Sequence, residues 1–458
     1  MSFLGIDLGT GGIRCLLIND NGKILADLSR PLGGINLSDV PGHSEQNPAE
    51  WVILLEDVLS ELFSQPSYRS VRAIAVDSTS GTILPVNREG IPLGNALMHN
   101  DIRAGEQALQ CKEVFGGSCS PTFSLPKALW MQSNLRLDQE TLFLHATDFL
   151  NCWLVGHTDL PTDSTNAMKS GLDLDTGEWS THLPDVRFPS VVPPGQIIGE
   201  LGKSHRNRWG LVHSVKIVSG ATDSNAGFYA SGAGLPGEWS TTIGTTLAIK
   251  GISQTKIHDP DGRIYCHRHP DGHWLPGGAS NGGGEILREH VDSIRTLASM
   301  KDCQTVPKSL VYPSIRKGER LPFLSSQFEP FFSGDKKDRK DYLLGCLEGI
   351  AFLELLSFEL LEELGASVGN KIFATGGAAS SDLGLQIRAN ILQKNLLVPE
   401  HPHSAMGAAI LAVAGFYDRK VGDVCKDIVS IKESIDPSSG LDACRLDKLN
   451  QFRELCSI

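Results

Sequence analysis

The sequence predicts an α/β protein of two domains. Its 458 residues exceed what one ordinary hydrophobic core supports, so more than one domain is expected. Apolar strands alternate with amphipathic helices along the chain, which is typical of sheets covered by helices. A strand, a Gly-Thr turn and a second strand open the chain and recur at 238–251, which indicates two domains of related plan.

The N-terminal elements are predicted from their turns and caps. Residues 3–32 predict three antiparallel strands, because the Gly-rich turn at 9–12 and the Asn-Gly pair within 19–22 each favour a hairpin. A helix is predicted at 47–63, with Asn47 as its N-cap. The first domain therefore begins as a meander followed by a helix.

Two buried strands then end in polar turns. The first, 71–76, runs into the hydroxyl-rich DSTSGT at 77–82, and the second lies within 215–227 and leads into a helix. Ligands of α/β sheets bind at the carboxyl ends of strands. We therefore expect both turns to open on one cleft.

A Gly- and Pro-rich stretch at 231–239 is the expected linker. It divides the chain into an N-terminal domain at 1–234 and a C-terminal domain at 235–458. The stretch also spells GxGxxG, but a dinucleotide fingerprint needs a strand before it and a helix after it. Residues 202–204 resemble the end of a P-loop, yet the required earlier Gly is Ile197 and no helix start is expected after them.

The second domain contains the most apolar long segment, 342–365. Its five Glu residues exclude a membrane span, so it predicts a buried helix. Residues 371–392 predict a strand, a Gly turn and a helix, and 404–415 predicts a helix of small residues that lets neighbouring backbone come close.

Composition excludes several classes of protein. The net charge of −12 opposes nucleic-acid backbones, so no nucleic acid is an expected partner. No targeting or membrane segment is recognised, and the ten scattered cysteines lack a CxxC pair, which favours reduced thiols in the cytoplasm. The expected partner is a small molecule, and the chain is expected to act as a monomer or homodimer.

Asp7 lies between the first strand and its Gly-Thr turn. The small residues Gly9 and Gly11 let backbone N–H groups approach phosphate oxygens, while Thr10 offers a hydroxyl and Asp7 can hold Mg²⁺ through water. An Asp that merely caps a hairpin explains this stretch alone equally well. The turn therefore needs support from elsewhere in the chain.

That support comes from a second Gly-Thr hairpin turn. Gly244, Thr245 and Thr246 stand in the corresponding place after the linker. Two facing hairpins can clamp one polyphosphate from opposite lobes, so the pair favours a phosphate site over a simple cap.

Six motifs in one order resemble the FGGY carbohydrate kinases of the actin-like ATPase superfamily. They are GIDLGTGGIR, GHSEQNPAEW, NDIRAGEQ, SGATDSNAG, TTIGTTL and ATGGAASSDLGLQIRANIL. The resemblance implies two actin-like (ribonuclease H-like) domains with a central cleft that holds ATP and a sugar. The turn at 77–82 is more similar to that of ribulose kinases and of short plant and cyanobacterial pentulose kinases than to that of glycerol kinases.

Asp223 is the candidate for the carboxylate that orients the attacking hydroxyl. It follows a buried strand and opens a helix, whose N-terminus would keep it ionised. By position alone an N-cap is the commoner use of Asp here. The resemblance of GATDSNAG to the catalytic segment of the family favours the catalytic role, and capping does not exclude it.

Candidate sugar ligands lie at the end of the strand 71–76 and beyond it. The hydroxyls of Thr79 and Ser80 suit a polyol, although a simple hydroxyl turn is the alternative. Asp101 and Arg103 either bind sugar hydroxyls or pair with each other, and the family pattern favours sugar binding for Asp101.

Arg14 is expected to be an edge residue whose stem covers the core. Gly376 and Gly377 resemble the adenosine-binding turn of the family, with a generic strand-to-helix turn as the alternative. Asn390 stands where the family usually has Asp, so any charge at that point is lost or moved.

The sequence thus favours an ATP- and Mg²⁺-dependent kinase of a ketopentose, with D-ribulose first and D-xylulose second. Mg²⁺ would bridge phosphates near Asp7, and Asp223 would orient the sugar hydroxyl. Two alternatives stay open: an actin-like or chaperone-type switch ATPase, and an inactive sugar-binding descendant of a kinase.

Overall fold

The computed structural model describes residues 1–458 except 35, 118, 183, 291, 293–305, 439, 441 and 458. The chain forms two compact units. Unit 1 comprises Met1–Ala230 and His403–Ile428, and unit 2 comprises Ser231–Pro402 and Val429–Ile458. The change at 230/231 lies within four residues of the expected boundary at 234/235, but residues 403–428, which the expected division assigns to the C-terminal domain, belong to unit 1.

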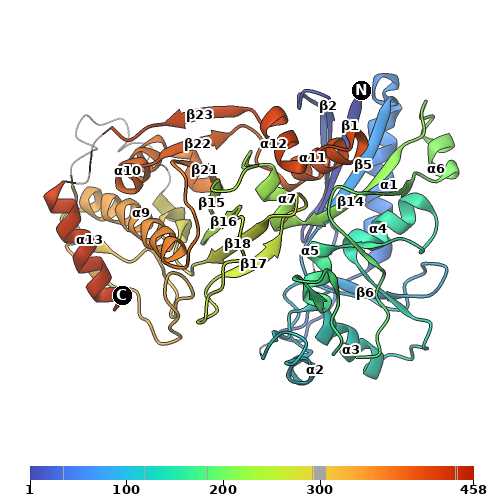
Figure 1. Ribbon diagram of the computed structural model, residues 1–458, viewed down its shortest axis with the longest axis horizontal. Helices are drawn as coiled ribbons and strands as arrows, with labels where there is room; N and C mark the ends of the chain where they lie inside the picture. The colour runs from blue at the N-terminus through green and yellow to red at the C-terminus, as the bar shows by residue number, and fades with distance from the viewer. Residues whose placement is uncertain are drawn as a thin grey trace. The chain divides into compact units, whose positions relative to one another are not determined.

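Close backbone packing explains why this late segment belongs to unit 1. Helix α11 (Ser404–Tyr417) packs against the first strand of the chain (Figure 1). A Cβ atom on Gly5 would lie 1.9 Å from the carbonyl oxygen of Ala405, and one on Gly407 would lie 1.8 Å from that of Ala226. Only glycine fits at such distances, so the prediction of a small-residue helix that admits neighbouring backbone is confirmed.

Unit 1 is built on a six-stranded sheet in the order β13-β14-β5-β1-β2-β3. Its strands are β1 (Ser2–Gly9), β2 (Gly12–Asn19), β3 (Ile24–Pro31), β5 (Val71–Ser78), β13 (Ile197–Glu200) and β14 (Lys216–Thr222). The predicted meander at 3–32 is confirmed as β1, β2 and β3, which pair antiparallel. Because β1, β5 and β14 pair parallel, their carboxyl ends lie at one edge of the sheet.

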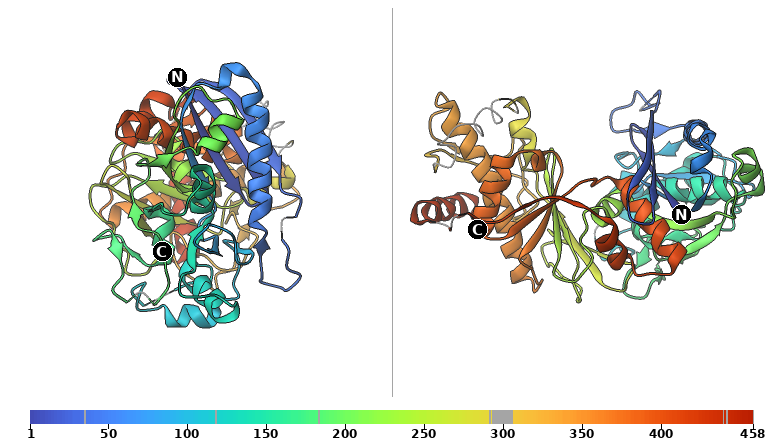
Figure 2. Two further views of the ribbon diagram at one scale, coloured as in Figure 1. Left: turned by 90° about the vertical axis from the view of Figure 1, so that its right-hand side faces the viewer. Right: turned by 90° about the horizontal axis from the view of Figure 1, so that it is seen from above.

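Helices cover both faces of this sheet. The predicted N-terminal helix is confirmed as α1 (Pro48–Ser64), and the side chain of Asn47 accepts a hydrogen bond from the backbone N–H of Ala49. Trp51 of α1 shares a core with Leu4 and Ile6 of β1, whereas the neighbouring Phe3 points to the opposite face and contacts Phe416 of α11. In Figure 2, α1 is the long blue helix that lies along the N-terminal strands.

Short elements complete unit 1. Its other helices are α2 (Gly105–Gln110), α3 (Ser124–Asn134), α4 (Ala146–Val155), α5 (Ser164–Ala167), α6 (Lys203–Arg208), α7 (Asp223–Tyr229) and α12 (Val421–Ile428). Its minor strands are β4 (Glu45–Gln46), β6 (Ile83–Val86), β7 (Ala96–Leu97), β8 (Leu142–His145), β9 (Thr162–Asp163), β10 (Leu172–Asp173), β11 (Glu178–Trp179) and β12 (Val191–Val192). Helix α6 begins directly after Gly202, contrary to expectation. It is a short helix of six residues, none of which is buried. Ile197 of β13 stands where a P-loop requires glycine, so a P-loop is still excluded.

Unit 2 is built on a seven-stranded sheet in the order β17-β18-β16-β15-β21-β22-β23. Its strands are β15 (Trp239–Ile243), β16 (Leu247–Gly251), β17 (Tyr265–Arg268), β18 (Trp274–Ala279), β21 (Lys371–Thr375), β22 (Asn395–Pro399) and β23 (Ile431–Ile435). The second strand–turn–strand pattern is confirmed as the hairpin β15–β16, in which Ile243 pairs with Leu247. The sheet thus begins as the sheet of unit 1 does.

Among the residues that the structure describes, three α-helices accompany this sheet. They are α9 (Arg339–Glu363), α10 (Asp382–Leu392) and α13 (Ala443–Cys456), with β19 (Leu310–Val311) and β20 (Phe332–Ser333) as a small separate pair. The predicted long buried helix is confirmed as α9, which packs against α10. Among the described residues, no helix combines the length and the apolar character that a membrane crossing requires.

Candidate functional site

Three aspartates meet at the carboxyl edge of the unit 1 sheet. Asp7 near the end of β1 pairs in register with Asp77 of β5, and Asp223 directly follows β14. Burial raises the pKa of Asp7 to about 6; the protonated Asp77 carboxyl opposes that rise and the charge of Asp223 adds to it. Burial also raises the pKa of Asp77 well above its ordinary range, as do the charges of Asp7 and Asp223. The cluster therefore holds a proton on Asp77 near neutral pH.

The Gly-Thr turn after Asp7 is fixed by a polar contact from β4, which α1 in turn holds in place. Gln46 Nε2 donates to the carbonyl oxygen of Thr10 at 2.8 Å, and Trp51 Nε1 donates to Gln46 Oε1 at 2.9 Å. This holds the turn in place while leaving the Thr10 side chain half-buried. Arg14, opposite Asp7 on β2, forms a fork with Asp27, so its role is an ion pair at the sheet edge.

Asp223 is the first residue of α7, and the N-cap position belongs to Thr222. The structure therefore does not use Asp223 as the N-cap of α7. Asp223 Oδ1 accepts from the backbone N–H of Ser224 at 2.7 Å, and the backbone N–H of Thr222 donates to Thr165 Oγ1 at 2.9 Å. These contacts fix the start of the helix and leave the carboxylate half-buried.

The acidic cluster fits a loosely held Mg²⁺ ion. Among the residues that the structure describes, no three His, Cys, Asp or Glu side chains converge as a complete metal cage. Mg²⁺ in phosphoryl-transfer sites keeps several waters and takes one or two carboxylates besides the phosphates of its substrate. Asp7 and Asp223 carry hard oxygen donors of that kind, and metal binding by Asp7 stays a prediction.

Hydroxyls and a lysine gather beyond the end of β5. Thr79 Oγ1 lies 2.6 Å from Thr82 Oγ1, so the hydroxyl-turn alternative is at least partly realised for Thr79. Lys169 Nζ donates to the carbonyl oxygen of Ser80 at 3.3 Å. Burial lowers the pKa of Lys169, and the charge of Asp223 opposes this. Lys169 and Asp223 are thus oppositely charged neighbours beside this turn.

The imidazole of His99 is a further basic group near Asp223. Its Nδ1 atom is buried and has no hydrogen-bond partner in the described part of the chain. Burial lowers the pKa of His99, and the charge of Asp223 opposes this, so the ring is neutral at neutral pH. Lys127, fully buried, ties the surrounding loops together by donating to the carbonyl oxygens of Gly81 and Met98 at 2.9 and 2.6 Å.

Lys169 rests on a buried polar chain. Ser170 Oγ lies 2.8 Å from His145 Nε2, and His145 Nδ1 lies 2.8 Å from Asp148 Oδ2. The arrangement resembles a hydrolase triad, but Ser170 and His145 have no exposed surface. It therefore fixes the segment that carries Lys169 rather than attacking a substrate.

Asp101 and Arg103 adopt the pairing alternative. Arg103 Nη2 donates to Asp101 Oδ2 at 2.8 Å, and Arg103 Nη1 lies 2.6 Å from Glu45 Oε1. Asp101 also accepts from the backbone N–H of Ser44 at 2.7 Å and has no exposed surface. Direct binding of sugar by Asp101 therefore stays a prediction, because these partners occupy its carboxylate.

In unit 2, the turn Gly244–Thr246 closes the hairpin β15–β16. The backbone N–H of Gly284 donates to the carbonyl oxygen of Gly244 at 2.9 Å. Arg288 Nη2 donates to Thr245 Oγ1 at 3.0 Å and leaves most of its side chain exposed. The turn thus combines small residues, a hydroxyl and a guanidinium, which suits an anion.

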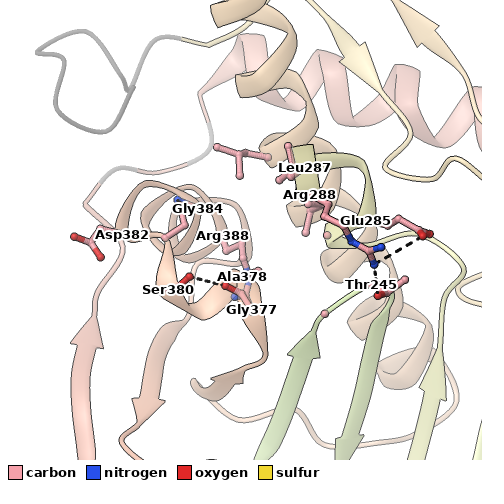
Figure 3. A pocket seen from close by; sticks show the side chains of 15 residues that line it. Thr245, Glu285, Leu287, Arg288, Gly377, Ala378, Ser380, Asp382, Gly384 and Arg388 are labelled. Atoms are coloured by element: carbon pink, nitrogen blue, oxygen red, sulfur yellow. Dashed lines mark hydrogen bonds and ion pairs between the residues drawn. The ribbon is translucent and has the colours of Figure 1, made fainter. Parts of the chain in front are cut away.

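A cavity of about 430 Å³ lies beside this turn within unit 2 (Figure 3). The predicted residues Gly244, Thr245 and Gly377 all line it. Gly376 has φ +83°, and a Cβ there would lie 2.6 Å from the carbonyl oxygen of Ile243 at the end of β15. Glycine is therefore required at this turn by both conformation and space.

Asn390 anchors a neighbouring loop. Its Oδ1 accepts from Gln386 Nε2 at 3.1 Å and from the backbone N–H of Ser438 at 2.8 Å. Both contacts need an acceptor oxygen, which the amide of Asn390 supplies.

Sequence reasoning missed four polar residues of these sites: Asp77, His99, Lys169 and Arg288. Asp77 had a readable signal, since an Asp that ends a buried strand next to the strand of Asp7 lies at the same edge. The other three come from segments whose positions depend on tertiary packing, and no local pattern marks them.

Comparison with known proteins agrees with this architecture. Residues 2–229 match the N-terminal domain, and residues 240–416 the C-terminal domain, of the FGGY family of carbohydrate kinases. The xylulose kinase of Bacillus subtilis is 27% identical over 446 residues, 90% of this chain and 88% of that protein. The gluconokinase of the same species is 25% identical over 448 residues, 90% of this chain and 86% of that protein.

Solved structures share the fold. A xylulose kinase from Rhodospirillum rubrum matches with a TM-score of 0.83 at 21% identity, covering 100% of this chain and 98% of that one. The match of both domains to carbohydrate-kinase family models favours a sugar kinase over the switch-ATPase alternative. The chain belongs to the FGGY family of carbohydrate kinases and is an ATP-dependent sugar kinase.

Proposed function

We propose that this kinase phosphorylates a ketopentose, with D-ribulose as the first candidate. The observation that carries the proposal is the environment of Asp223, whose charge acts on both Lys169 and His99 beside the hydroxyl-rich end of β5. An ammonium group and a neutral imidazole can bind the carbonyl and hydroxyl oxygens of a ketose. A carboxylate in their midst can accept the proton of the hydroxyl that attacks ATP.

Several of the predicted groups have a part in the proposed reaction. Asp223 orients the sugar hydroxyl and takes up its proton. Asp7 would hold Mg²⁺, and the ion would neutralise the charge that builds up on the transferred phosphoryl group. The turn at Gly9–Gly11 in unit 1 and the turn at Gly244–Thr246 in unit 2 donate to phosphate oxygens, and Gly376 with Gly377 leaves space for the base.

D-Xylulose is the second candidate, because relatives of this chain are named xylulose kinase. The two ketoses differ only in the direction of one hydroxyl, so a few donors decide between them. Gluconate is a weaker third candidate, from the relatives named gluconokinase; its carboxylate would also find a cation in Lys169.

The test is ATP consumption with D-ribulose, D-xylulose, gluconate, glycerol and no sugar. We expect D-ribulose to stimulate turnover most, and Asp223→Asn to lower the stimulated rate by about 10²- to 10⁴-fold. Ser224→Ala, next to it on the same helix, is the matched control and should stay near the wild-type rate. ATP turnover that does not depend on sugar and is unchanged in Asp223→Asn would overturn the proposal. A preference for gluconate would overturn the assignment of a ketopentose as the substrate.

A further inference from the structure

One buried arginine that lines the cavity of unit 2 has a hydrogen-bond donor without a partner among the described residues. Arg388 on α10 is only 2% exposed, yet it lines the cavity of Figure 3. Its Nε and Nη2 atoms donate to the two carboxylate oxygens of Glu354 on α9, at 2.7 and 2.8 Å. Its Nη1 atom is buried and has no hydrogen-bond partner among the residues that the structure describes.

A buried donor without a partner is costly to keep. Such groups are rare in native proteins, and each one calls for an explanation such as a ligand that completes it. The fork with Glu354 fixes the guanidinium plane, so Nη1 cannot turn away to find another acceptor. An acceptor atom placed in the cavity would complete the set of hydrogen bonds of Arg388.

The surroundings indicate what kind of acceptor this is. The cavity wall next to Arg388 includes Leu347 and Ile350 of α9 and the bare backbone of Gly384 on α10, which suits a flat, apolar ring. Glu354 neutralises the charge of Arg388, so the pair offers a directed donor without a net charge. That favours a neutral acceptor over a phosphate, for which Arg288 and the turn at Thr245 are better placed.

We propose that Arg388 is a specificity residue that reads the nucleobase, with Nη1 donating a hydrogen bond to a ring nitrogen of a purine held in this cavity. Glu354 is its positioning residue. The inference rests on the proposed placement of the nucleotide in unit 2 and goes beyond it by naming the group that distinguishes the base.

The experiment measures the dissociation constant of ADP and of its 1-deaza, 3-deaza and 7-deaza analogues, in which one ring nitrogen is replaced by C–H. For the wild type we expect one analogue to bind about ten- to a hundredfold more weakly than ADP, as for loss of a hydrogen bond to a charged donor. The double variant R388M/E354M removes the pair without leaving a buried charge, and it should bind ADP and that analogue equally.

The matched control is R453M/E359M. Arg453 Nη2 donates to both oxygens of Glu359 at 2.6 and 2.7 Å, and this pair also joins α9 to another helix but does not line the cavity. It should keep the wild-type discrimination. Binding of inorganic pyrophosphate, which has no base, should be the same in all three proteins.

Two results would overturn the inference. The first is that the wild type binds all three analogues within about twofold of ADP, because loss of a hydrogen bond to a charged donor should weaken binding more than that. The second is that R388M/E354M discriminates between ADP and the analogue as strongly as the wild type does. Should that variant not fold by circular dichroism, the wild-type series still decides the question. Sugar-stimulated turnover is measured separately. Its absence would refute the ketopentose kinase, whereas stimulated turnover with no base discrimination would refute the role of Arg388 alone.

Discussion

We expect the burial of Asp7 in the acidic cluster to lower the folding stability of the kinase. Burial raises the pKa of Asp7 from 3.8 to about 6, so the folded chain binds the Asp7 proton more tightly than the unfolded chain does. The stabilising contribution of the protonated form is complete below the unfolded pKa and is lost as pH rises through the folded pKa. At pH 8 the ionised Asp7 therefore destabilises unit 1.

The magnitude follows from the shift. A difference of about two pKa units corresponds to about 3 kcal/mol at pH 8. Asp7→Asn keeps the shape and the acceptor oxygen but carries no charge, so it should stabilise the protein by up to that amount. The gain should shrink to about half at pH 5, where the folded wild type already holds the proton. Kinase activity should be lost at both pH values.

Differential scanning calorimetry without Mg²⁺ or nucleotide checks this prediction. For a domain of 150–250 residues, about 3 kcal/mol corresponds to a rise in Tm of about 6 °C or more. Asp20→Asn, an exposed carboxylate paired with the N-terminus, is the control and should give no gain. A variant Asp7→Asn that is no more stable than the wild type at pH 8, or whose gain is the same at pH 5, would refute the reasoning.

Three further outcomes are expected. Gly376→Ala should lower the free energy of unfolding in a urea titration by about 2 kcal/mol, because φ is +83° and the new Cβ would meet the carbonyl oxygen of Ile243. It should also weaken ADP binding. Gly377→Ala is the control, because open space surrounds Gly377, and it should change the free energy of unfolding little. Lys169→Met should raise the KM for the sugar by about tenfold or more while the dissociation constant of ADP stays constant, as expected for loss of one charged hydrogen bond; an equal change in both would contradict its place beside the sugar. In the pH profile of kcat/KM, activity should fall below about pH 6 as Asp7 is protonated, and a profile flat down to pH 5 would contradict that.

Local signals in the sequence were enough for much of the fold. The hairpin turns at 9–12 and 244–246, the cap at Asn47 and the linker near residue 231 each depend on the backbone preferences of a few adjacent residues. The Gly-Thr turns of the candidate site belong to the same category.

What the sequence did not predict depends on contacts between distant segments. The return of α11 to unit 1 follows from glycines on two elements that are about 400 positions apart, Gly5 and Gly407. The pairing of Asp7 with Asp77 needs the register of two parallel strands. The fork between Arg388 and Glu354 needs the packing of α10 on α9. None of these leaves a mark within a short window of residues.

The central claim is that Asp223 directs a ketose hydroxyl onto the terminal phosphate of ATP. Phosphorus NMR of a reaction with ATP, Mg²⁺ and D-ribulose tests it most directly, because it identifies both products. The account predicts that ADP and a pentulose phosphate ester appear in equal amounts, and that Asp223→Asn suppresses both. Formation of ADP with inorganic phosphate and no sugar ester would contradict it.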